Sequence, residues 1–178
     1  MCLDCADRCK AITGCLHNIK RHKTTKPDTK GDKNMAVTIK LTGLTDHFSL
    51  SEYSKHQAGT VEVSAEALLH AQCLEEFRRW LGKPMTVNGW YRTVAYNKKV
   101  GGNAKSSHLR GVATDWGLPG VSRDDFIHYA KKWKAICKAH GIVGEAGLYT
   151  WGIHLGSSVK YSKTFYHWDT RSGKQVNL

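Results

Sequence analysis

The chain has 178 residues, of which 40% are hydrophobic and 24% charged, so a wholly disordered protein and a collagen-like one are excluded. No apolar run reaches the roughly 18 to 20 residues of a membrane-spanning helix, which excludes an integral membrane protein. Lys and Arg outnumber Asp and Glu by 27 to 15, a surplus of +12. Such a surplus favours an anionic partner, whether nucleic acid, anionic lipid or the acidic polymers of a bacterial wall.

Residues 1–34 differ in composition from the rest of the chain. Their first fifteen positions hold four of the six cysteines: Cys2, Cys5, Cys9 and Cys15. With His17 and His22 these would make a metal-binding knuckle, but the spacing C-x2-C-x3-C-x5-C fits no standard zinc pattern. We expect 1–34 to be a disordered or non-native basic leader before one domain over 35–178. It lacks the apolar core of a secretory signal.

Helices are predicted where a capping residue precedes an apolar stripe. A short helix over 48–53 has Ser49 or Ser51 as its cap, and a longer one begins at Ser64 and stops at Gly82. A third spans 93–100. The last begins at Ser122, where Asp125 completes a capping box, and ends near Gly141. Cys73 and Cys137 fall on apolar faces, which predicts core thiols and synthesis in a reducing compartment.

Short strands are predicted over 85–87, 112–116, 147–155 and 164–170, where β-branched and aromatic residues concentrate. Helices come first and strands dominate later. This order predicts an α+β fold with a small antiparallel sheet and flanking helices.

The segment 106–116 carries the first candidate site. In a strand over 112–116, Asp115 shares a face with the small Ala113, while Val112, Thr114 and Trp116 point into the core. The turn at Gly111 brings His108 back toward Asp115. An imidazole and a carboxylate are good zinc ligands.

The segment 165–171 carries the second group of candidate site residues. His167 lies on one strand face with Phe165 and Asp169, which offers a third ligand and, about 7 Å further along, a carboxylate. Two His and one Asp leave one position of a tetrahedral zinc open for water, which is the catalytic arrangement.

The pattern Ser106-x-His108-x-x-Gly111-x-Ala113-x-Asp115 resembles the signature of the VanY-type zinc D-alanyl-D-alanine carboxypeptidase family, which includes phage endolysins. Segments on both sides are similar to the family as well: 88–102 (Asn-Gly-Trp-Tyr-Arg-Thr to Val-Gly-Gly), 48–52 and 147–169. The resemblance covers about residues 46–172. It implies the zinc D-Ala-D-Ala peptidase (hedgehog/DD-peptidase) fold.

Carried over by position, the resemblance makes His108, Asp115 and His167 the zinc ligands, with one Zn2+ per chain. It makes Arg92 a catalytic and substrate-facing residue and Ser106 a substrate-binding one. The places where many members carry their general base hold Thr164 and Phe165 here. We therefore expect Asp169 to be the base or a partner that orients a ligand, with Glu145 as the fallback base. His154, in 151–156, is a rival third ligand.

The resemblance implies a zinc-dependent peptidase that hydrolyses amide bonds in peptidoglycan stem peptides, as a D,D-carboxypeptidase or an endopeptidase. We expect a monomer made in the cytoplasm that acts at the cell wall, in phage lysis or on the virion, with no nucleic-acid or integral membrane partner. The alternative is a catalytically inactive module that binds wall peptides. A nucleic-acid binder is disfavoured because no helix-turn-helix or RNP-like element is present.

Overall fold

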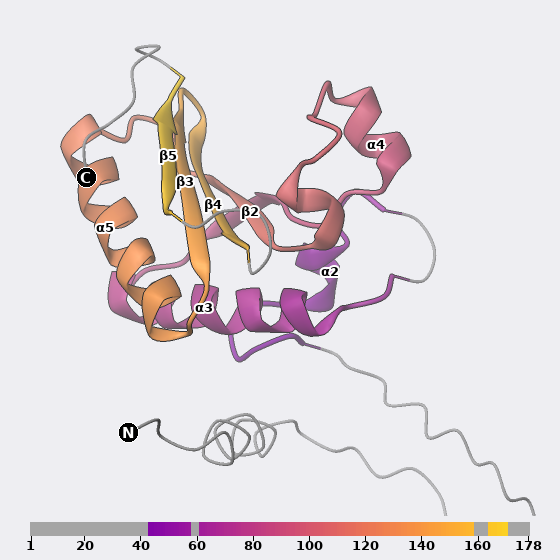
Figure 1. The fold of residues 1–178 in the computed structure, drawn as a ribbon, viewed down its shortest axis with the longest axis horizontal. Helices are drawn as coiled ribbons and strands as arrows, with labels where there is room; N and C mark the ends of the chain where they lie inside the picture. Colours follow the sequence, from indigo (N-terminus) through magenta and orange to yellow (C-terminus); the bar gives the residue numbers. More distant parts are fainter. Residues whose placement is uncertain (1–42, 58–60, 159–163, 171–178) are drawn as a thin grey trace, which may run out of the picture. The chain divides into compact units, whose positions relative to one another are not determined.

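A five-stranded sheet is the centre of the computed structural model, which describes residues 43–57, 61–158 and 164–170 (Figure 1). The chain divides into two units, 1–38 and 39–178, and all described residues belong to the second. The expected leader over 1–34, with its cysteines, lies outside the described residues. None of the described helices is long and apolar enough to cross a membrane.

The strands are short and lie in the order β1-β2-β4-β3-β5. Every neighbouring pair is antiparallel except β3 and β5, which run parallel. Their bounds are β1 Thr86–Gly89, β2 Ala113–Gly117, β3 Val143–Tyr149, β4 Gly152–Ser158 and β5 Tyr166–Asp169. The expected α+β class is confirmed, and the sheet that was expected to be antiparallel contains one parallel pair, β3 and β5.

The helices begin at the side-chain caps that the sequence predicts. Ser49, Ser64, Thr93 and Ser122 each accept a hydrogen bond from a backbone N–H in the first turn of the helix that follows. At the end of α3, Gly82 adopts the left-handed conformation (φ 69°) that favours glycine. The elements are α2 Leu50–Tyr53, α3 Ala65–Leu81, α4 Val94–Lys99, the 3₁₀ helix η2 Ser107–Arg110 and α5 Arg123–Ala139.

One segment differs from its expected structure. The residues 147–155 are not a single strand but the middle of a hairpin, in which β3 and β4 are joined by a turn at Thr150 and Trp151. The aromatic and β-branched residues that predicted one strand continue through this turn, so the local pattern contains no break to mark it.

The two faces of the sheet have opposite chemistry. One is covered by α3 and α5 and is apolar, with fully buried side chains from three strands: Trp116, Ala146, Leu148, Ile153 and Leu155. In Figure 1, α5 and α4 lie on opposite sides of the sheet. The second face carries small residues at many of its outward positions: Ala113, Gly117, Gly147, Gly152 and Gly156. These leave room above the strands for polar side chains.

Candidate active site

His108 stands at the edge of the polar face because of a short, tightly bounded turn. The Ser106 hydroxyl accepts the His108 backbone N–H at 3.4 Å, which begins η2, and Gly111 (φ 69°) ends it. The buried His108 ring donates its Nδ1–H to the Trp90 carbonyl, 2.6 Å away. That bond fixes the tautomer, so Nε2 is left with a free lone pair that faces Asp115.

Asp115 lies at the centre of the site. Its Oδ1 is 3.2 Å from His108 Nε2 and 2.9 Å from His154 Nδ1, and its Oδ2 accepts a hydrogen bond from Arg92 Nη2. The carboxylate therefore joins side chains from η2, from β4 and from the segment after β1. The predicted meeting of His108 with Asp115 across the Gly111 turn is what the structure shows.

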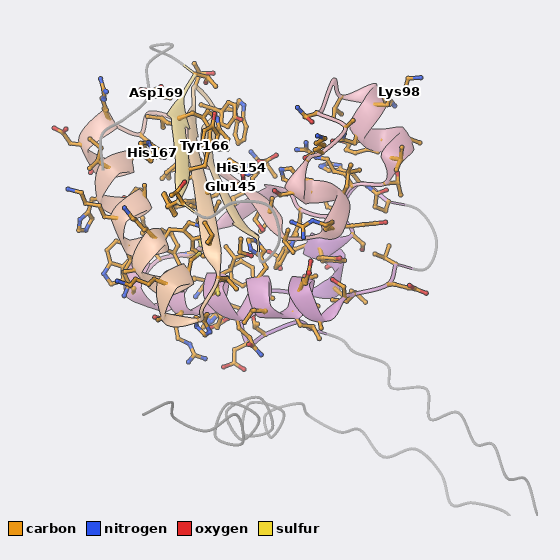
Figure 2. All side chains as sticks on the ribbon, in the orientation of Figure 1. Lys98, Glu145, His154, Tyr166, His167 and Asp169 are labelled. Atoms are coloured by element: carbon orange, nitrogen blue, oxygen red, sulfur yellow. The ribbon has the colours of Figure 1, made fainter. Side chains whose placement is uncertain are left out.

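His154 comes to the site because its strand pairs with that of Asp115. The two residues are directly opposite in the β2–β4 register, so their side chains share a face. His154 Nε2 lies 3.3 Å from Glu145 Oε1 on β3. Figure 2 labels Glu145 and His154 close together on the sheet. One imidazole thus stands between two carboxylates.

These three side chains have the geometry of a metal site. One ligand atom from each of His108, Asp115 and His154 lies within 4.8 Å of the other two, and all three residues are buried. Two imidazoles and one carboxylate are the donor types that zinc accepts, and three protein ligands leave the fourth tetrahedral position for water or substrate. The residues therefore fit a zinc ion.

The pKa shifts follow from burial and from these pairings. Burial opposes ionisation of Asp115, but its close pairings with the His108 and His154 imidazoles outweigh burial and hold the pKa of Asp115 well below its usual range. For His154, hydrogen bonds to Asp115 and Glu145 outweigh burial and raise the pKa to about 9. Burial lowers the pKa of His108. Before a metal binds, His154 is the cation and His108 is neutral.

The structure places His167 outside this group. This residue pairs with Ala146 across β3 and β5, whereas its neighbour Trp168 pairs with Gly147, the partner of His154. A shift of one residue along a strand exchanges the faces. His167 therefore faces α5, where burial and then the charge of Lys134 lower its pKa, and it is not part of the His108, Asp115 and His154 group.

Asp169 lies on the same strand face as His167. It pairs with Leu148, which is fully buried in the core, and Asp169 is itself 4% exposed. The sequence placed His167 and Asp169 correctly on a common strand face, but that face is the one that α3 and α5 cover. In Figure 2, both are labelled apart from His154 and Glu145.

Trp168, and not His167 or Asp169, lies on the polar face of β5. Its ring centroid is 5.3 Å from that of His154, and its Nε1–H donates to the Tyr149 hydroxyl at 3.0 Å. A Cβ built on Gly147 would lie 2.3 Å from the indole, so the ring lies directly on this glycine. Trp168 therefore walls the site on the β5 side, a role that the sequence pattern did not indicate.

A cavity of about 210 Å³ opens beside Asp115 on the opposite side of the site. Arg92, Asn88 and Tyr96 line it together with His56 and Trp151. The Arg92 side chain is only 18% exposed, and its buried Nε has no hydrogen-bond partner. A buried donor without a partner costs free energy.

This α+β domain, in which two imidazoles and a carboxylate converge above the sheet, has the donor set of a catalytic zinc site. The chain is a member of the peptidase M15 family, whose model matches residues 46–150, more than half of the sequence. This match includes His108 and Asp115 but ends before His154 and His167. The choice between the two histidines therefore rests on geometry.

A curated relative agrees with this membership. The chain is 38% identical over 68 residues to a protein of Streptomyces albus G named zinc D-Ala-D-Ala carboxypeptidase. The aligned residues make up 38% of this chain and 27% of the relative. The chain thus spans about a quarter of the length of the curated relative that it matches.

Proposed function

We propose that this protein is a zinc-dependent peptidase that hydrolyses amide bonds in peptidoglycan stem peptides. The observation that carries the proposal is the convergence of His108, Asp115 and His154 at the open face of the sheet. Membership of the peptidase M15 family and the name of the Streptomyces relative support the reaction and the substrate class. When bound, zinc supplies Lewis acidity and activates water at neutral pH.

We assign the role of general base to Glu145 in place of Asp169. Glu145 lies next to His154, on the polar face, and its side chain is 24% exposed, so water reaches it. Burial opposes its ionisation, but hydrogen bonds to His154 and Ser107 lower its pKa to about 2. The carboxylate is thus ionised at neutral pH and can accept a proton. A neutral His154 no longer lowers the Glu145 pKa by charge, which makes the carboxylate a stronger base.

Arg92 is proposed to bind a substrate oxygen. Its guanidinium lines the cavity beside Asp115, where it suits the carboxylate of a C-terminal residue. The cavity of about 210 Å³ is smaller than the roughly 300 Å³ at which drug-sized pockets begin. It suits one small residue after the scissile bond, which favours carboxypeptidase over endopeptidase action. Ser106, at the start of η2, is proposed to assist at the same side of the site.

The proposed setting is the bacterial cell wall, in phage lysis or on the virion. The net charge of +12 supports attraction to anionic wall polymers. If this attraction targets the enzyme, added salt lowers activity on whole walls much more than activity on a short soluble peptide, because salt screens exposed charges.

The test is digestion of purified peptidoglycan and of a defined stem peptide, with products identified by mass spectrometry. We expect release of a terminal residue with zinc, loss with chelator and recovery with zinc restored. Glu145→Gln should lower kcat by about 10² or more while zinc remains bound. His128→Gln, at an exposed position of α5 outside the proposed site, is the matched control. Cleavage that withstands the chelator contradicts the proposal, and zinc-loaded protein that binds the peptide without cleaving it supports the inactive binding module.

A further inference from the structure

We propose that His70, a buried histidine of α3, is a positioning residue that holds the strands of the metal site in place. This inference rests on the proposed zinc site and extends it to a side chain that touches neither the metal ligands nor the cavity beside them. His70 is fully buried, on the apolar side of the sheet, behind the site. Three sets of contacts support this role.

The first two contacts join His70 to the strands that carry Asp115 and His154. Its Nε2 lies 3.0 Å from the Thr114 hydroxyl on β2, and its Nδ1 lies 2.8 Å from the Ser157 hydroxyl on β4. Thr114 immediately precedes Asp115, and its hydroxyl is also fully buried. A shift of Thr114 therefore moves Asp115 directly, and a shift of Ser157 moves the strand of His154.

The third contact joins His70 to the support of His108. The His70 ring packs edge-to-face against Trp90, with centroids 5.6 Å apart. The carbonyl of Trp90 accepts the Nδ1–H of His108, and its indole donates to the Gly111 carbonyl, which ends η2. His70 is thus in contact with the support of each of the three proposed ligands.

The chemistry of the contacts requires a neutral imidazole and not an apolar side chain. A neutral ring has one donor and one acceptor nitrogen on opposite sides, and a hydroxyl can form a hydrogen bond with either. Both ring nitrogens and both hydroxyls are thereby satisfied in the core. Burial, together with the neighbouring imidazoles of His154 and His108, lowers the pKa of His70 to about 3, so the ring stays neutral at the pH of the reaction. A leucine of similar size would leave both hydroxyls without a partner.

The experiment measures zinc affinity by competition with a chromophoric chelator, and ligand geometry by the visible spectrum of the Co2+-substituted protein. His70→Leu should weaken zinc binding by about tenfold or more and shift the Co2+ bands, as loss of outer-shell partners of metal ligands does. His70→Gln, which keeps a donor and an acceptor, should restore affinity to within about threefold. Thr114→Val removes one hydroxyl with little change of shape and should weaken zinc binding in the same direction.

Leu74→Ala is the matched control, since Leu74 is fully buried in the core one turn further along α3. It should lower thermal stability and leave zinc affinity and the Co2+ spectrum unchanged. The positioning role is overturned if His70→Leu and Thr114→Val both bind zinc as the wild type does, or if Leu74→Ala weakens binding equally. Should His70→Leu fail to fold, the zinc affinities of Thr114→Val and Leu74→Ala are compared instead. Weaker binding by Thr114→Val alone then supports the positioning role, and equal binding overturns it. Failure of the wild type to bind zinc would instead overturn the proposed function itself.

Discussion

Zinc binding to this protein should release about one proton at pH 7, and His154 should be its source. Hydrogen bonds to Asp115 and Glu145 raise the pKa of His154 to about 9, so the metal-free ring is about 99% protonated two units lower. A metal ligand must be the neutral imidazole. His108 has a lowered pKa, and both carboxylates are already ionised, so these groups have no proton to lose at pH 7.

The effect on zinc affinity follows from the two pH units between the pKa of His154 and pH 7. Removing the proton weakens apparent zinc affinity about 100-fold at pH 7, or ~2.7 kcal/mol, and each further unit of acid costs about tenfold. Glu145→Gln removes one of the two carboxylates that stabilise the cation. We therefore expect the pH range of proton release to move downward in this variant.

Calorimetry in buffers of different ionisation enthalpy measures the protons directly, because the observed heat varies with that enthalpy by the number released. A slope of about one at pH 7 that falls to about one half at pH 9 agrees with the structure. A slope near zero at pH 7 would refute the reasoning, since His154 would then be neutral before zinc arrives.

Three further predictions concern packing, acid stability and the cavity. Gly147→Ala places a Cβ 2.3 Å from the Trp168 ring, so denaturant unfolding should show a loss of about 1–3 kcal/mol, and an unchanged midpoint would be contrary to the described contact. His70 has a folded pKa of about 3 against 6.5 unfolded, so its contribution is complete above pH 6.5 and is lost as the pH falls toward 3. Between pH 6.5 and 5.0 unfolding in urea should show a loss of about 1.6 kcal/mol that His70→Gln lacks, and equal losses would exclude His70 as the cause. Arg92→Gln should raise KM for a peptide with a free C-terminal carboxylate more than for its amide, and equal effects on both would exclude carboxylate binding by Arg92.

The sequence was sufficient for features that depend on neighbours in the chain. Ser64 and Ser122 predicted the starts of α3 and α5, because a capping hydroxyl satisfies N–H groups only a few residues away. The Gly111 turn predicted the meeting of His108 and Asp115, since only seven residues separate them. The resemblance to VanY-type peptidases agreed with the family that the comparison found.

The third member of the site could not be derived in this way. Alternation along β5 correctly grouped His167 with Asp169, but a strand pattern does not say which of the two faces is covered by helices. That choice is set by the β3–β5 register, which pairs His167 with Ala146 and directs it toward α5. The hairpin turn at Thr150 and Trp151 was missed because aromatic and β-branched residues continue through it. Without it, His154 could not be placed opposite Asp115.

Zinc content of two single variants tests the central claim most directly. His154→Ala and His167→Ala each remove one imidazole from the C-terminal part of the domain, and each is read by metal analysis after dialysis against trace zinc. We predict that the wild type and His167→Ala retain about one zinc per chain, as the proposed three-ligand site requires, and that His154→Ala retains almost none. Zinc lost from His167→Ala and kept by His154→Ala would contradict the site described here.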